Sequence, residues 1–259
     1  MAKADPRLYP SFTVENNKKP NRILNFPIFG FLIKIIILIP VFIEGFFLGV
    51  AGIFLLVINW FVISFTGRYW NTAYTFFVGL IRLFLKIKLF LFGITDTYPG
   101  FRLNDKGIFS LTIDKPKNPN KWFAIPILGI LARVILLLPY LIFSDIMQRG
   151  SGIAWFLSWF VILFKGRLPE RFYEFERDSL RVYTAATMYV LGLSDDYPSF
   201  YISMDHQTTK LLLIIVGTIL SLFNTLGSLA PSEKSSYNSS NYHQYYTPPS
   251  GGSSNYNTY

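Results

Sequence analysis

The sequence repeats itself at a spacing of 99 residues. Residues 20–103 align with residues 119–202 without a gap, and 25 of the 84 aligned pairs are identical. A bias toward apolar residues produces some of these matches, but it does not produce the matched glycines, prolines, arginines and aspartates. The sequence therefore predicts one structural unit that is present twice. We expect both units to have the same orientation, because the segment between them is as basic as the N-terminus.

The composition predicts that this repeated unit lies in a membrane. Hydrophobic residues make up 51% of the chain and charged residues only 15%, whereas about 25% of residues are charged in soluble domains. The chain has no cysteine, which excludes disulfides, thiol catalysis and cysteine-bound metals. The chain has a net charge of +9. In a membrane protein, such an excess of lysine and arginine is typical of loops that face the cytoplasmic, anionic side of the membrane. Anionic membrane lipids are therefore expected partners, and nucleic acid is not.

Each unit divides into three helical segments. In the second unit they cover residues 125–143, 153–164 and 169–192, and those of the first unit end at residues 43, 65 and 93. The polar, glycine-rich stretch 144–152 separates the first two segments, and we predict a turn there that makes them a helical hairpin. The third segment is charged in its first half, which is typical of an amphipathic helix at the membrane interface. In a competing interpretation, the first two segments form one spanning helix and the third is the return span.

The predicted fold is an all-α integral membrane protein. Two tandem repeats of a helical hairpin plus an interfacial amphipathic helix precede a C-terminal membrane segment and a flexible tail. The predicted boundaries are a polar basic N-terminus at 1–22, membrane repeats at 23–103 and 119–202, a linker at 104–118, a C-terminal membrane segment at 203–230 and a tail rich in tyrosine, serine and asparagine at 231–259. Hairpins would place nearly all lysines and arginines on the side of the N-terminus. We therefore expect a multi-pass protein of the cytoplasmic (cell) membrane with a cytoplasmic N-terminus.

Four arginines that match between the units are candidate contacts for lipid head groups. Gly67 and Gly166 end the second segment of each unit, because glycine readily adopts the left-handed backbone of a helix end. The arginine that follows either marks the phosphate layer and fixes the topology, or binds an anionic lipid through two hydrogen bonds to its phosphate. The candidates are Arg68, Arg167, Arg82 and Arg181.

Lys34 and Arg133 are matched cations near the middle of the first segment. A cation at the bilayer centre costs about 2.5–3.5 kcal/mol on insertion scales. These side chains therefore either face a carboxylate of a partner subunit, extend toward the interface from a shallow hairpin, or line a cavity that binds an ion or ligand. Asp96 and Asp195 are the one pair of matched acids. We expect each of them to accept backbone N–H groups in its turn or to form an ion pair with the arginines named above.

The sequence offers no recognisable catalytic or cofactor site. The two histidines, His206 and His243, lie in polar segments and form no metal-ligand cluster. There is no phosphate-binding loop, no dinucleotide fingerprint and no set of serine, histidine and aspartate beyond chance. We therefore expect no metal, no cofactor and no enzymatic activity.

The first unit carries motifs of a known family. These motifs consist of Trp60, Phe61, Phe65, Thr66, Gly67, Arg68 and Tyr69, then Arg82, and then Thr95, Asp96, Thr97, Tyr98, Pro99, Gly100 and Phe101. They resemble the bacterial membrane-protein family called domain of unknown function 4389. The second unit departs from the motif, since Lys165 replaces threonine and Leu168 replaces tyrosine, although Pro169 matches. The resemblance implies two tandem copies of this domain in a prokaryotic cytoplasmic-membrane protein, and it supplies no catalytic residues.

We therefore expect a non-enzymatic, membrane-embedded structural or accessory subunit. It would pack against other membrane proteins in a larger complex and bind anionic lipids. Two alternatives stay open. Short hairpins in one leaflet would act as wedges in a membrane-shaping protein. Two repeats around a pathway lined by Lys34 and Arg133 would instead form a small transporter or channel.

Overall fold

The computed structural model describes residues 8–14, 17, 19–103 and 109–229. Its elements are, in order, β1 (Ser11–Val14), α1 (Phe29–Thr66), α2 (Asn71–Leu91), β2 (Phe109–Thr112), the short 3₁₀ helix η2 (Lys121–Ala124), α3 (Leu128–Lys165), α4 (Glu170–Val190) and α5 (Gln207–Leu229). The protein is mostly helical, as the sequence predicts. The third segment of each unit corresponds to α2 or α4, and the C-terminal membrane segment corresponds to α5. The tail predicted at 231–259 lies outside the described residues.

The two predicted hairpins do not form. α1 and α3 are uninterrupted helices of 38 residues each, and the stretch 144–152, where the sequence predicts a turn, lies inside α3. Its polar side chains do not end the helix, because they have partners on neighbouring helices. Gln148 donates to Ser179 of α4, and Asp145 accepts from Ser221 of α5. The polar stretch is thus a contact face of the helix, and the first two segments of each unit form one continuous helix.

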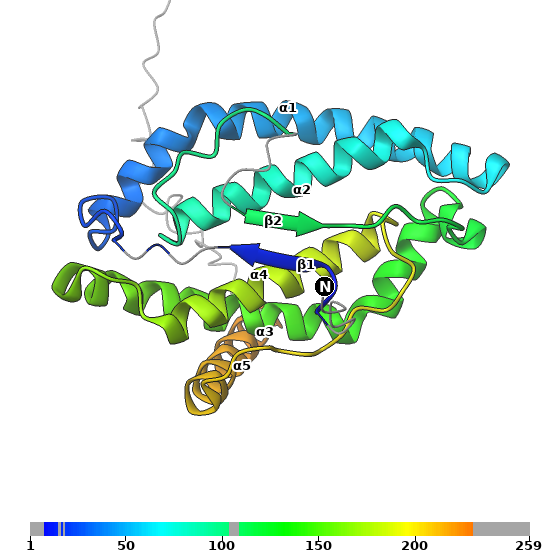
Figure 1. Ribbon diagram of the computed structural model, residues 1–259. Coiled ribbons are helices and arrows are strands. Elements are labelled where there is room, and N and C mark those ends of the chain that lie inside the picture. The colour runs from blue at the N-terminus through cyan, green and yellow to red at the C-terminus, as the bar shows by residue number, and fades with distance from the viewer. Residues whose placement is uncertain (1–7, 15–16, 18, 104–108, 230–259) are drawn as a thin grey trace, which may run out of the picture.

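The helices of the two units begin and end at equivalent positions, 99 residues apart. α1 and α3 end at Gly67 and Gly166, as predicted, with φ angles of 67° and 65°. Residues with a side chain adopt this left-handed conformation only at a cost. The N–H of each glycine bonds the carbonyl oxygen four residues earlier, and the chain then reverses into α2 or α4 (Figure 1).

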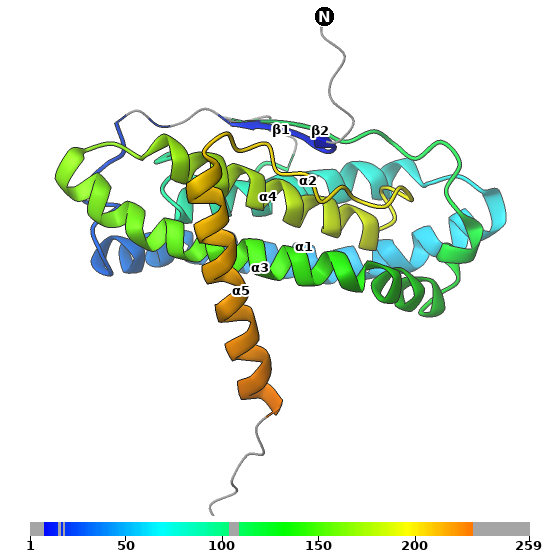
Figure 2. The same cartoon turned by 90° about the horizontal axis from the view of Figure 1, so that it is seen from below.

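The elements form three layers, which Figure 2 shows from the side. The sheet lies on one side, α2 and α4 form the middle layer, and α1 and α3 form the opposite side. α5 runs across these layers, passes α3, and projects from the side of α1 and α3 (Figure 2). α1 and α3 run in opposite directions (Figure 1). The end of each therefore lies beside the start of the other, with Lys121 against Gly67 and Arg22 against Gly166.

A small two-stranded sheet, which the sequence does not predict, accompanies the helices. β1 and β2 pair antiparallel, with Val14 opposite Phe109. Phe12 and Leu111 are buried in a core that also contains residues of α2 and α4. The strands lie in the segments predicted as the polar N-terminus and the linker. Each strand has only four residues, an alternation too short to be recognised when its partner is far away in the chain.

α5 crosses α3 where both helices carry a glycine. A Cβ on Gly150 would lie 2.7 Å from the carbonyl oxygen of Leu213, and a Cβ on Gly217 would lie 3.0 Å from the backbone nitrogen of Gly150. Small residues at such a crossing let two helix backbones approach closely. One turn further along α5, Ser221 donates to Asp145 of α3 at 2.7 Å. The crossing holds α5 in its course across the layers.

Candidate functional site

α1 has the polarity of a helix in lipid. Only seven of its 38 residues are buried, and these include the polar Lys34 and Asn59, each 1% exposed. Its outer face carries Phe46, Phe47 and Phe54, each 66% exposed. A helix on the surface of a soluble protein has the opposite arrangement, with its apolar residues turned inward.

α3 has the same inverted polarity. Arg133, Ser151 and Ser158 are buried, while Ile135 and Phe164 are exposed. Because α2, α4 and the sheet all lie on one side of α1 and α3, the opposite side of these two helices is left uncovered (Figure 2). We refer to this surface as the apolar face. Its large exposed side chains include Ile36, Phe46, Phe47, Ile53, Phe54, Ile58, Leu128, Leu131, Ile135, Leu138 and Ile142.

Three helices are long and apolar enough to cross a membrane. They are α1, α3 and residues Gln207–Ser228 of α5. The projecting part of α5 is apolar on the outside as well, since Leu222, Phe223 and Leu226 are exposed. Large uncovered apolar surfaces of this kind mark contact with lipid or with another protein, so the chain associates with a membrane.

Arg133 is buried and holds the end of α4. Its Nη1 donates to the carbonyl oxygen of Tyr189 at 2.8 Å and to that of Ser194 at 3.1 Å, and its Nη2 forms an ion pair with Asp195. The guanidinium also lies over the ring of Phe123, 4.7 Å from the centroid. A carboxylate and the carbonyl end of a helix, where cations are stabilised, therefore neutralise this charge inside the protein.

Lys34 has the equivalent place in the first unit but reaches its carboxylate indirectly. Its Nζ donates to Oδ1 of Asn25 at 2.8 Å and to the carbonyl oxygen of Leu91 at 3.4 Å. The amide nitrogen of Asn25 in turn donates to Asp96 at 3.3 Å. Lys34 and Arg133 are thus both hydrogen-bonded within the protein.

Asp96 and Asp195 tie the segment before each long helix to the loop after the shorter helix. Asp96 accepts the backbone N–H of Asn21 at 2.7 Å, and Asp195 accepts that of Asn120 at 2.8 Å. Both donors come from another part of the chain and not from the turn that contains the aspartate. Among the described residues, the ion-pair partner of Asp195 is Arg133, and neither aspartate pairs with a candidate head-group arginine.

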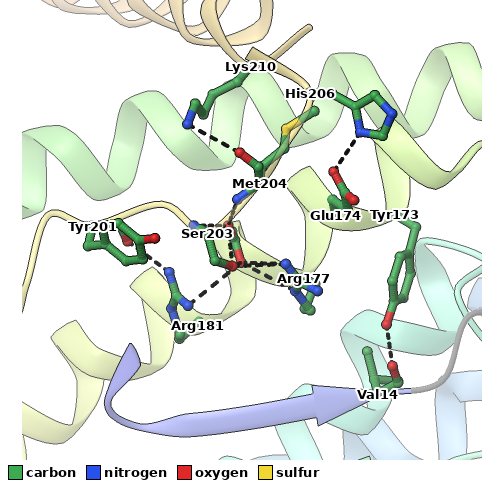
Figure 3. Close-up of polar contacts among 11 residues, drawn as sticks. Val14, Tyr173, Glu174, Arg177, Arg181, Tyr201, Ser203, Met204, His206 and Lys210 are labelled. Carbon is green, nitrogen blue, oxygen red and sulfur yellow. Dashed lines mark hydrogen bonds and ion pairs between the residues drawn. The ribbon is translucent and has the colours of Figure 1, made fainter. Parts of the chain in front are cut away.

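The four candidate head-group arginines divide into two exposed and two inward-facing residues. Arg68 and Arg167 are exposed directly after α1 and α3. Arg82 donates to a backbone carbonyl oxygen of β2 at 3.4 Å. Arg181 is buried and donates to the carbonyl oxygen of Tyr201 at 2.8 Å (Figure 3). The second pair thus contacts the sheet and the loop before α5, whereas the side chains of the first pair are exposed.

Asp178 fixes the loop that leads into α5. Its Oδ2 accepts the backbone N–H groups of Ser203 and Met204 at 2.6 and 2.9 Å. Its Oδ1 lies 3.8 Å from the guanidinium of Arg181. Lys210, in the first turn of α5, donates to the carbonyl oxygen of Met204 at 3.2 Å (Figure 3). α4 therefore positions the start of α5.

A buried polar cluster joins α2, α3 and α4. Glu176 is 2% exposed; one carboxylate oxygen is hydrogen-bonded to Ser151, and the other has no partner in the described part of the chain. Lys88 of α2 donates to Gln148 at 2.9 Å and lies over the ring of Tyr183. Burial raises the pKa of Glu176 to about 8, although the Ser151 hydrogen bond and the charge of Lys88 oppose this shift. The carboxyl group is therefore mostly protonated at neutral pH.

A cationic cleft lies at the corner between α3 and α4. It has a volume of about 790 Å³, and its lining includes Lys165, Arg167, Arg171 and His206 together with apolar side chains of both helices. His206, directly before α5, lies 2.8 Å from a carboxylate oxygen of Glu174 (Figure 3). The cleft therefore combines positive charge with an apolar wall.

The described ranges hold no group of three or more histidine, cysteine, aspartate or glutamate side chains that could bind a metal ion. A second cleft, of about 540 Å³, lies between residues 114–118 and the loop after α4. Lysines and aspartates both line it, so its charge selects neither anions nor cations.

Comparison with known proteins gives one match. Residues 128–201 match the family described as domain of unknown function DUF4389. This is the family that the sequence motifs resemble. The match covers α3, α4 and the loop that contains Asp195, so it accounts for the second unit only. No curated protein and no solved structure matches the chain.

Several residues that organise the site escape sequence analysis. Asn21 and Asn120 carry a usable signal, because they are identical and aligned in the repeat. Asn25 has no such signal, since the second unit has alanine at the equivalent position. The sequence predicts that Glu176 and Asp178 are surface charges of an amphipathic helix, but both are buried.

Proposed function

We propose that this protein is a non-enzymatic accessory protein of the cytoplasmic membrane, which packs against other membrane proteins and binds anionic lipids. The observation that carries the proposal is the inverted polarity of α1 and α3, whose buried residues include polar side chains and whose outer side chains form the apolar face. Lipid or another membrane protein satisfies such a surface, whereas water does not. Two charges that would be costly in lipid, Lys34 and Arg133, are turned inward and bonded.

In this proposal α5 crosses the membrane while α1 and α3 lie in the plane of one leaflet. At a rise of 1.5 Å per residue, the 23 residues of α5 extend about 34 Å and the 38 residues of α1 or α3 about 57 Å. The hydrocarbon core is about 30 Å thick. The length of α5 therefore matches the core, whereas α1 and α3 are each almost twice as long as the core is thick. α5 also runs across the layers that α1 and α3 follow (Figure 2). This arrangement replaces the expected multi-pass topology with one crossing.

The sheet, α2 and α4 then face the water on the N-terminal side of the membrane. Arg22 and Lys121 lie against the terminal glycines of α3 and α1, next to the exposed Arg167 and Arg68. Each end of the apolar face thus presents paired cations at the depth of the lipid phosphates. Because positive segments favour the cytoplasmic, anionic side, we place this side in the cytoplasm.

We also infer that the two units are tandem copies of one domain. The support is the equivalent position of their helix ends and the pair of bonds from Asn21 to Asp96 and from Asn120 to Asp195. These bonds recur at the same spacing of 99 residues as the identical pairs of the sequence.

Extraction in mild detergent followed by native mass measurement tests the accessory role. We expect the chain in a larger complex with at least one other membrane protein, and with anionic phospholipid bound. Recovery of a single chain free of both protein partners and lipid contradicts the proposal.

The proposed position of α1 and α3, parallel to the membrane within one leaflet, favours a second candidate function, the shaping of membranes. Two helices in one leaflet displace lipid there and not in the opposite leaflet, which favours curvature. Purified protein should then tubulate liposomes, and liposomes that keep their shape reject this function. No observation favours the transporter alternative, because Lys34 and Arg133 are both engaged within the protein.

A further inference from the structure

We propose that the cationic cleft at the corner of α3 and α4 binds the phosphate-bearing head group of one anionic phospholipid. This inference rests on the proposed function, because it requires the corner to lie at the membrane surface. The cleft of about 790 Å³ lies at the end of α3, where the apolar face ends and the chain turns toward the water-facing layers (Figure 2). Lipid phosphates lie at this depth if α1 and α3 are embedded in the leaflet.

The cations of the cleft are available to an anion. Lys165, Arg167 and Arg171 are exposed, and no hydrogen bond or ion pair engages any of them within the described residues. Glu170 is the one acid in the lining, so the cleft keeps a net positive charge. Arginine suits phosphate because its planar head group donates two parallel hydrogen bonds to two phosphate oxygens.

The apolar wall of the cleft favours a lipid over free phosphate. Val161, Leu168 and Phe172 line it beside the cations. Phe164, three residues after Val161, is 77% exposed and continues this wall onto the apolar face. A phospholipid can therefore place its phosphate among the cations and its acyl chains along α3, whereas inorganic phosphate would leave the apolar wall unused.

The equivalent corner of the first unit lacks this charge. Thr66 stands where the second unit has Lys165. Thr72 stands where it has Arg171. Arg68 corresponds to Arg167, and Lys121 lies against Gly67 as Arg22 lies against Gly166, so the second corner has two additional cations. The second unit is therefore the specific lipid site, and the first unit serves as an internal control.

Native mass spectrometry of the full chain tests the site. The protein is delipidated in detergent and titrated with phosphatidylglycerol, and we expect one lipid to bind more tightly than the rest. The triple variant K165Q/R167Q/R171Q should bind that lipid about tenfold more weakly, because three charge-assisted interactions are removed. The matched variant R102Q/K115Q/K117Q loses the same charge at exposed positions that do not line the cleft and should keep the lipid. The charge-preserving variant K165R/R167K/R171K should bind it with an affinity between those of the wild type and the glutamine variant, because lysine keeps the charge but not the paired hydrogen bonds.

Each other outcome overturns part of the account. Equal weakening in both glutamine variants would show general attraction between charges and reject the cleft. Displacement of the lipid by an equal concentration of inorganic phosphate would reject the assignment to a lipid. A wild-type protein that binds no anionic lipid at all would reject the proposed function itself, whereas tight binding that survives in both variants rejects only the cleft. Thermal melting of each variant, followed by circular dichroism, verifies that it is folded.

Discussion

Arg133 bonds Asp195 directly, whereas its counterpart Lys34 reaches Asp96 only through Asn25. Both cations also donate to carbonyl oxygens at the end of the shorter helix of their unit. Arginine offers several donors in a planar fork that reaches carbonyl and carboxylate oxygens lying apart from one another, whereas all the donors of lysine are on one nitrogen atom. Asn25 supplies the missing link in the first unit. The two units therefore reach one architecture with different side chains.

Removal of Arg133 should destabilise the protein more than removal of Lys34. Arg133→Leu leaves the carboxylate of Asp195 and two carbonyl oxygens without their donor, and the loss of a partner from a buried pair costs about 3–5 kcal/mol. Lys34→Leu strands only the neutral Asn25 oxygen and one carbonyl, which costs about 1–3 kcal/mol. Denaturant unfolding in bicelles measures both. Lys117→Gln, at an exposed position, is the control, and equal stability of Arg133→Leu and the wild type would contradict the structural role.

The buried Glu176 predicts a loss of stability as the pH rises. Its pKa is raised from 4.5 to about 8 in the folded protein because of burial. Between these two pH values the folded chain binds more protons than the unfolded chain, so the free energy of unfolding falls with increasing pH. Glu176→Gln keeps the shape of the side chain but does not titrate.

We therefore expect the stability of Glu176→Gln relative to the wild type to grow from pH 5 to pH 8, the range of the raised pKa. Thermal unfolding of both proteins across this range measures the difference. Asp205→Asn, an exposed acid, should show no such trend. A difference that stays constant with pH would mean that Glu176 is already charged in the folded protein.

The crossing of α3 and α5 predicts that Gly217 tolerates no side chain. A Cβ there would clash with the backbone of α3 near Ile146, whereas Gly227 has open space around it. Gly217→Leu should therefore separate the two helices, and Gly227→Leu should not. Cysteines at positions 145 and 221, introduced into a chain without native cysteine, report the distance through cross-linking yield. An unchanged yield in Gly217→Leu would show that the helices do not cross at this point.

Local patterns in the sequence identify the helices, but they do not reveal how the helices are used. Gly67 and Gly166 mark real helix ends, because a left-handed residue is a local requirement. The prediction of a turn at 144–152 is wrong, because polar and small residues occur both in turns and in the contact faces between packed helices. Only the partners of Gln148 and Asp145 on other helices distinguish the two.

The sequence likewise identifies the main residues of the candidate site but not the residues that they bond. The matched pairs of the repeat lead to Lys34, Arg133 and Asp195, and the structure brings these residues into buried networks. Their exact partners depend on which loop meets which helix end. The same limit applies to Arg181, which resembles a head-group contact in sequence but bonds a backbone carbonyl oxygen.

The depth of α1 in the bilayer tests the central claim most directly. Single cysteines at positions 36, 47 and 58, all on the apolar face, carry nitroxide labels whose depth is measured by oxygen and nickel accessibility. Positions 211, 219 and 226 on the outer surface of α5 serve as the comparison. We predict one common depth for the three labels of α1 and a steady progression through the bilayer for those of α5. Labels on α1 whose depths differ by most of the roughly 33 Å that separates positions 36 and 58 along a helix would show that α1 crosses the membrane and would contradict the account.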